Sequence, residues 1–150
     1  MKIRIVVIDG MGGGIGAALI PRLKEIAASA HSAGVEDIEI IALGANAIAT
    51  ERMMKAGAHR GASGENAVKR SVALGDFIVG PIGIVIANSL MGEISADMAE
   101  AVLNAPGERI LLPLQNDHFH IAGFESASLA KLIDDAVAYL KKRLDTKHPS

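Results

Sequence analysis

A stretch of β-branched residues that runs directly into a cluster of glycines constrains this chain more than any other feature. Residues 3–8 (Ile-Arg-Ile-Val-Val-Ile) have the pattern of a strand that is covered on both faces. After Asp9, residues 10–16 (Gly-Met-Gly-Gly-Gly-Ile-Gly) break the strand, and apolar side chains then recur on one side of a helix expected over residues 17–30. The order strand, glycine loop, helix is typical of the beginning of a parallel α/β unit.

The rest of the chain continues this alternation of strands and helices. Further buried strands are expected at residues 38–43, 77–79 and 109–112, with an antiparallel edge strand at 118–122. Further helices are expected from Asn46 or Thr50 through Lys55, from Ser63 to Gly75, over 96–103 after the capping Ser95, and from Ser126 onward. Residues 84–91 could form a strand or a helix, because periodicity cannot decide for so short an apolar run.

Strands and helices that alternate through short connections form parallel sheets with right-handed crossovers. We therefore expect an α/β, Rossmann-like three-layer sandwich, with a mostly parallel sheet of about five strands and helices on both faces. The expected strand order is third, second, first, fourth, fifth. A single domain over residues 1–145 is expected, and residues 146–150 are expected to be a disordered tail.

Composition excludes several classes of function. The chain has no cysteine, which excludes disulfides, thiolate catalysis and cysteine-based metal sites. A formal net charge of −2 gives no electrostatic footprint for nucleic acid. The longest apolar stretch, residues 77–91, contains glycine, proline and asparagine and is shorter than the ~20 residues of a membrane helix. The sequence predicts a cytoplasmic protein that is not bound to membranes, and its positive mean hydropathy predicts a homo-oligomer.

The glycine loop is the strongest signal of function. Glycines leave backbone N–H groups accessible to a phosphate, and the dipole of the following helix adds to the attraction. No Gly-Lys-Ser/Thr follows the glycines, which argues against nucleotide hydrolysis of the P-loop class. The alternative is that the glycines only permit a tight turn and close packing of helix on strand.

Glycines also end the strands at 38–43 and 77–79. In a parallel sheet the carboxyl ends of the strands lie at the same edge, and ligands bind there. The residues predicted to hold a cofactor at this edge are Asp9, Gly10, Gly12, Gly13, Gly14, Ile15, Gly16, Gly44, Asn46, Gly80, Pro81 and Asn88. For Asp9 three roles are open: it could accept a ribose hydroxyl, bind a cation, or cap the N–H groups of the loop itself.

The spacing Gly10-x-x-x-Gly14-x-Gly16 is similar to the loop of short-chain dehydrogenases, but two of their features are missing. An NAD site usually has an acid at the end of the second strand, and residues 42–44 (Ala-Leu-Gly) have none. The Tyr-x-x-x-Lys pair of that class is also absent, since Tyr139 is followed by Arg143 at the matching position. Basic residues downstream could meet a 2′-phosphate or be solvated helix charges: Arg52, Lys55 and Arg60.

Other polar residues are weaker candidates. His118 and His120 alternate, so both could face a metal near Asp117, or they could form the outer face of an edge strand; we favour the strand and predict no metal site. Glu65 and Glu93 each lie beside a glycine turn, and they are the candidate general acid–base residues if the protein is an enzyme.

Several motifs together resemble a family of small bacterial proteins that is catalogued only as a domain of unknown function, number 3842. The resemblance covers roughly residues 1–124 and rests on the segments 9–16, 42–47, 55–58, 61–66 and 80–89. It implies a Rossmann-like domain and brings no known activity, so it assigns no catalytic residue.

The function expected from the sequence is the binding of a nucleotide or dinucleotide, with NAD or NADP the expected cofactor. The chain would be a sensor or an accessory subunit. One alternative is a small enzyme that acts on a phosphorylated metabolite with Glu65 or Glu93 as acid–base; another is an assembly protein without a ligand.

Overall fold

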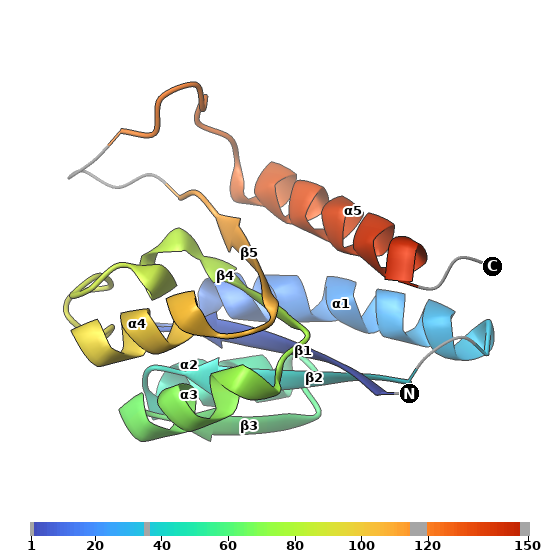
Figure 1. The fold of residues 1–150 in the computed structure, drawn as a ribbon, viewed down its shortest axis with the longest axis horizontal. Helices are drawn as coiled ribbons and strands as arrows, with labels where there is room; N and C mark the ends of the chain where they lie inside the picture. Colours follow the sequence, from blue (N-terminus) through green and yellow to red (C-terminus); the bar gives the residue numbers. More distant parts are fainter. Residues whose placement is uncertain (1, 35–36, 115–119, 148–150) are drawn as a thin grey trace.

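The computed structural model describes residues 2–34, 37–114 and 120–147. Its centre is a sheet in which all strand pairs of the described chain are parallel, in the order β3-β2-β1-β4-β5. The strands are β1 (Lys2–Asp9), β2 (Asp37–Gly44), β3 (Arg60–Ser63), β4 (Phe77–Pro81) and β5 (Glu108–Leu112). The α/β, Rossmann-like sandwich expected from the sequence is confirmed (Figure 1).

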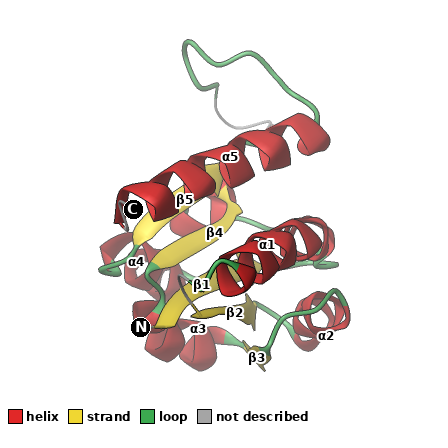
Figure 2. Ribbon diagram, turned by 90° about the vertical axis from the view of Figure 1, so that its right-hand side faces the viewer, coloured by secondary structure: helices red, strands yellow, loops and turns green. Residues whose placement is uncertain are grey.

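Helices cover both faces of the sheet. They are α1 (Gly14–Ser32), α2 (Ala47–Lys55), α3 (Glu65–Ser71), α4 (Ala96–Asn104) and α5 (Leu129–Lys147), with 3-10 turns η1 (Val72–Leu74) and η2 (Ile82–Val85). Figure 2 shows the sheet between α1 on one side and α3 and α4 on the other. None of the helices in the described ranges is both long and apolar enough to cross a membrane.

The central strand β1 is covered by helices on both faces, which explains why its sequence is apolar on both faces. Side chains of β1 alternate between two cores: Ile5 and Val7 lie in the core beneath α1 and α5, and Val6 and Ile8 lie in the core beneath α3 and α4. All four are fully buried. A strand that is covered on both sides needs apolar residues at successive positions, which is the pattern that predicted it.

The identity of two strands was predicted wrongly. Residues 60–63 form β3 at the edge beside β2, so the strand at 77–81 lies beside β1 and not beside β2 as expected. The Arg-Gly-Ala-Ser sequence of β3 has no apolar pattern because this edge strand is largely exposed. The fifth strand expected at 118–122 is also wrong in part: residues 120–122 are not in a strand, and 118–119 lie outside the described residues.

The ends of several helices differ from expectation for local reasons. Ser63 pairs with Gly44 in the sheet, so α3 begins only at Glu65. Helix α5 begins at Leu129 and continues to Lys147, two residues into the expected tail. Residues 84–91 form neither a strand nor an α-helix; they contain the end of η2 and a series of tight turns.

The N-cap of α4 gives a direct test of the fold. Ser95 Oγ accepts a hydrogen bond from the N–H of Met98 (3.2 Å) and donates one to the Glu65 carboxylate on α3 (2.5 Å). We expect Ser95→Ala to lower the free energy of unfolding by about 1 kcal/mol, because an N–H of the first turn loses its acceptor. Urea denaturation measures this change. The matched control is Ser32→Ala at the exposed end of α1, where a change below about 0.5 kcal/mol is expected; equal effects at both positions would contradict the capping role.

Candidate functional site

The carboxylate of Asp9 organises the loop between β1 and α1. Its side chain is buried, and its two oxygens accept hydrogen bonds from the N–H of Gly10 and the N–H of Gly16, both at 2.8 Å. Burial raises the pKa of Asp9, the N–H groups of Gly16, Gly10 and Ile15 oppose this, and the negative charge of Glu93 adds to the increase. Of the three roles open for Asp9, the structure shows the capping of the loop's own N–H groups.

Gly13 is required by the fold, and Gly10 and Gly16 lie in close contact with neighbouring side chains. Gly13 has a φ of +73°, and a methyl group on it would lie 2.7 Å from Cα of Ala49 in α2. A methyl group on Gly16 would lie 2.4 Å from Sδ of Met53, and one on Gly10 would lie 3.0 Å from Cδ1 of Leu90. These contacts agree with the packing interpretation, in which glycine allows backbones and helices to approach closely.

The other two glycines, Gly12 and Gly14, are not required by the fold. Both are exposed, neither has a positive φ, and a methyl group on either would lie 3.5 Å or more from its nearest neighbour, Nη1 of Arg52. Within the described part of the chain, the N–H groups of Gly12 and Gly14 make no hydrogen bond. Two exposed residues therefore present backbone N–H groups without an acceptor among the described residues beside a guanidinium group, at the beginning of the 19-residue helix α1.

A second polar group lies at the other end of the same loop. Oε1 of Glu93 accepts a hydrogen bond from the N–H of Met11 (2.5 Å), and Oε2 accepts one from Nδ2 of Asn46 (2.6 Å). Asn46 also donates to the carbonyl oxygen of Met11 (2.9 Å) and caps α2 by accepting from the N–H of Ala49 (2.8 Å). The loop after β1, the start of α2 and the segment before α4 thus meet at one point.

Comparison with known protein families gives a match. The family model described as Domain of unknown function (DUF3842) matches residues 4–145. The chain belongs to this family. The match extends beyond residue 124, where the resemblance seen in the sequence ended, and includes most of α5. A search of curated proteins found no match.

The other residues predicted to hold a cofactor are Gly44, Gly80, Pro81 and Asn88. The first three have structural roles or are buried in the fold, whereas Asn88 is exposed. A methyl group on Gly44 would lie 2.2 Å from Oγ1 of Thr50, and one on Gly80 would lie 2.4 Å from the carbonyl oxygen of Ile8. Pro81 is buried at the end of β4, and Asn88 is exposed with a φ of 65° and donates its N–H to the carbonyl oxygen of Ile94. The fold explains both glycines, while no hydrogen bond joins Asn88 to the glycine loop among the described residues.

The two glutamates predicted as acid–base candidates lie in different places. Glu93 is at the glycine loop, but Glu65 is exposed at the start of α3 and pairs with Ser95. The described residues contain no group of three or more metal-ligating side chains. His118 and Asp117 lie outside the described residues, and His120 is exposed.

Two features of the site were missed by sequence reasoning. Arg52 was considered only for a 2′-phosphate or as a solvated charge, yet its Nη1 donates to the carbonyl oxygen of Gly12 (3.3 Å). Its position on the exposed side of α2, one residue before the buried Met53, was visible in the sequence, but the packing of α2 against the loop was not. Glu93 lies 82 residues after Met11, and no local pattern links the two.

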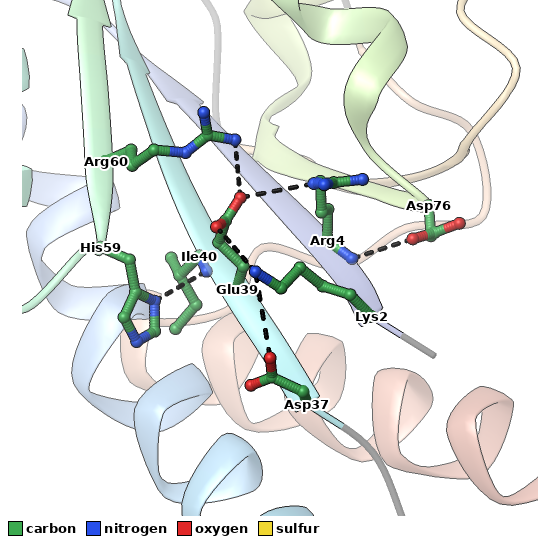
Figure 3. A network of polar contacts seen from close by, with 8 residues as sticks. All are labelled: Lys2, Arg4, Asp37, Glu39, Ile40, His59, Arg60 and Asp76. Atoms are coloured by element: carbon green, nitrogen blue, oxygen red, sulfur yellow. Dashed lines mark hydrogen bonds and ion pairs between the residues drawn. The ribbon is translucent and has the colours of Figure 1, made fainter.

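A separate charged cluster lies away from the glycine loop, where β1, β2 and β3 carry alternating charges (Figure 3). Glu39 accepts from Arg60 (2.7 Å), Arg4 (3.4 Å) and Lys2 (3.5 Å). Burial alone would raise the pKa of Glu39, but the hydrogen bond and charge of Arg60, together with Lys2, lower it. The cluster pairs cations with carboxylates from neighbouring strands and offers no unpaired group that would hold a ligand.

Proposed function

We propose that this chain binds a nucleotide or dinucleotide, with a phosphate held by the loop at residues 12–14. NAD or NADP is the expected ligand. The observation that carries the proposal is that Gly12 and Gly14 are glycine without a packing or conformational reason. A side chain at either position would occupy the space through which a phosphate approaches the two N–H groups.

Positive charge also favours a phosphate beside Gly12 and Gly14. The guanidinium of Arg52 lies beside Gly12 and Gly14, and the helix dipole of α1 is positive at this end. Arginine is well suited to phosphate because its planar donors match phosphate oxygens. The other expectations, a sensor or accessory role, a cytoplasmic location and a homo-oligomer, stay predictions.

The proposal is tested by native mass spectrometry of freshly purified protein, together with thermal-shift titrations of NAD, NADP, ATP, FMN and coenzyme A. A co-purified mass or a stabilising nucleotide is the expected result. Its absence with every one of these compounds would favour the assembly alternative, in which the glycines serve packing alone.

Gly14→Leu is the matched variant. We expect it to weaken binding of the identified nucleotide at least about ten-fold, because its side chain would cover the open N–H groups of Gly12 and Gly14. The unfolding transition should stay close to that of the wild type, since the position is exposed with an ordinary φ. Unchanged affinity in a folded Gly14→Leu protein would contradict the proposed position of the phosphate.

A further inference from the structure

Glu93 places a carboxylate near the end of strand β2, where residues 42–44 have no acidic side chain. It belongs to the segment between η2 and α4, and its Oε2 accepts from Asn46, the residue two positions after the end of β2. In dinucleotide sites an acid at the end of the second strand accepts the hydroxyls of the adenosine ribose. Residues 42–44 do not supply it, but Glu93 reaches the same strand end from a segment that follows β4.

The carboxylate is held in a fixed orientation and keeps capacity for a ligand. Within the described residues, each oxygen of Glu93 has one donor, Met11 N–H for Oε1 and Asn46 Nδ2 for Oε2. An ionised carboxylate offers about four lone-pair sites, so each oxygen can accept a further hydrogen bond. The side chain is only partly buried, which leaves it accessible.

The two ends of the loop differ in charge. Near Gly10 and Met11 lies the carboxylate of Glu93, and near Gly12 and Gly14 lies the guanidinium of Arg52. A phosphate is favoured at the second end and repelled at the first, whereas a neutral hydroxyl is favoured at the first. A ligand that fits both ends carries a phosphate with a hydroxylated sugar beside it.

We propose that Glu93 is the specificity-determining residue of this site, accepting hydrogen bonds from the free hydroxyls of a ribose and excluding a ribose that carries a 2′-phosphate. The inference rests on the proposed nucleotide binding and deepens it, because it selects NAD over NADP. The competing interpretation is that the Glu93 carboxylate occupies donors that a phosphate takes over when it binds; in that case removal of the charge would strengthen binding of both nucleotides.

Isothermal titration of NAD and NADP against the wild type, Glu93→Gln and Glu93→Asp separates these possibilities. The wild type is expected to bind NAD at least about ten-fold more tightly than NADP, since like charges placed together are unfavourable. Glu93→Gln is expected to weaken NAD binding about ten-fold and to reduce the preference for NAD, because a charge-assisted hydrogen bond is lost. Glu93→Asp keeps the charge but shortens the reach, so it should weaken NAD while still disfavouring NADP. Glu100→Gln on the exposed side of α4 removes the same charge away from the loop and should change neither affinity.

Each outcome has a distinct meaning. Binding of neither NAD nor NADP, by the wild type or by Glu93→Gln, would overturn this inference, and the proposed function would fall with it only if ATP, FMN and coenzyme A also failed to bind. Equal wild-type affinities for NAD and NADP, both lost in Gly14→Leu, would leave the proposed function standing and overturn the role of Glu93. Tighter binding of both by Glu93→Gln would also overturn it in favour of displacement by phosphate. If Glu93→Gln does not fold, as judged by circular dichroism, the wild-type preference and Glu93→Asp decide the question.

Discussion

Gly80→Ala is expected to lower the free energy of unfolding by about 3 kcal/mol, whereas Gly14→Ala is expected to raise it by about 0.5 kcal/mol. The added methyl group at Gly80 would lie 2.4 Å from the carbonyl oxygen of Ile8, which is backbone of the neighbouring strand β1. Relief of that contact requires β1 and β4 to separate in the middle of the sheet. At Gly14 the methyl group meets only the guanidinium group of Arg52, with Nη1 at 3.5 Å and Cζ at 3.9 Å, which are ordinary contacts.

Urea denaturation of the two variants beside the wild type measures both changes. The pair is matched because the substitution is the same and both glycines were predicted from sequence to hold the cofactor. A loss of stability at Gly14 as large as at Gly80 would show that the fold needs both glycines, and the argument for an open phosphate position at Gly14 would fail. Similar stability of all three proteins would contradict the close approach of β4 to β1.

Asp9→Ala is expected to lower the free energy of unfolding at neutral pH by about 2–4 kcal/mol. The N–H groups of Gly10 and Gly16 would be left in a buried place without an acceptor, at a cost of about 1–3 kcal/mol each. Relief from burying a carboxylate offsets part of this cost. Loss of the Asp9 bonds also frees the loop, so affinity for the proposed nucleotide should fall with stability.

The pH dependence of this difference has a defined sign. Because the pKa of Asp9 in the folded protein is raised above its ordinary value of 3.8, chiefly by burial, the folded protein binds the proton more tightly than the unfolded chain does. The part of the Asp9 contribution that depends on protonation is therefore fully present below pH 3.8 and is lost as the pH rises through the raised value, while the hydrogen bonds from Gly10 and Gly16 still contribute at neutral pH. The difference between wild type and Asp9→Ala should grow as the pH is lowered from neutrality through this window.

Glu39→Gln provides a control of opposite sign. Since the pKa of Glu39 is lowered in the folded protein, its contribution is present above its ordinary value of 4.5 and is lost as the pH falls through the folded-state value. Chemical denaturation of the three proteins at several pH values measures both trends. An Asp9→Ala difference that shrinks on acidification, in parallel with Glu39→Gln, would mean that Asp9 is stabilised as a carboxylate in the fold and would contradict its raised pKa.

The sequence predicted the parts of the fold whose signals are local. The strand at 3–8, the glycine loop and the following helix were predicted because a doubly covered strand and a breaker leave plain patterns. The strand at 60–63 was missed because an exposed edge strand is held by backbone pairing and does not require an apolar pattern in its sequence. That omission also placed the strand at 77–81 beside the wrong neighbour.

The candidate site was predictable only in part, for a related reason. Asp9 and the glycines are adjacent in sequence, so their gathering at the end of β1 followed from the motif. Which glycines pack and which lie open depends on α2, whose Ala49 and Met53 approach Gly13 and Gly16 but not Gly12 or Gly14. The contact of Glu93 with Asn46 depends on tight turns in which Leu90 and Met91 adopt left-handed φ values of 54° and 57°, and such values are not predictable from residue type.

The bridge from Glu93 to Met11 and Asn46 joins stretches of chain that lie 82 and 47 residues apart. The group that would choose a ligand and the groups that would hold its phosphate are thus inherited on separate segments. If the proposal on Glu93 holds, a change of length between η2 and α4 would alter the choice of ligand while the glycine motif stayed intact. Classification of such proteins by their glycine loop alone would then group together members with different ligands.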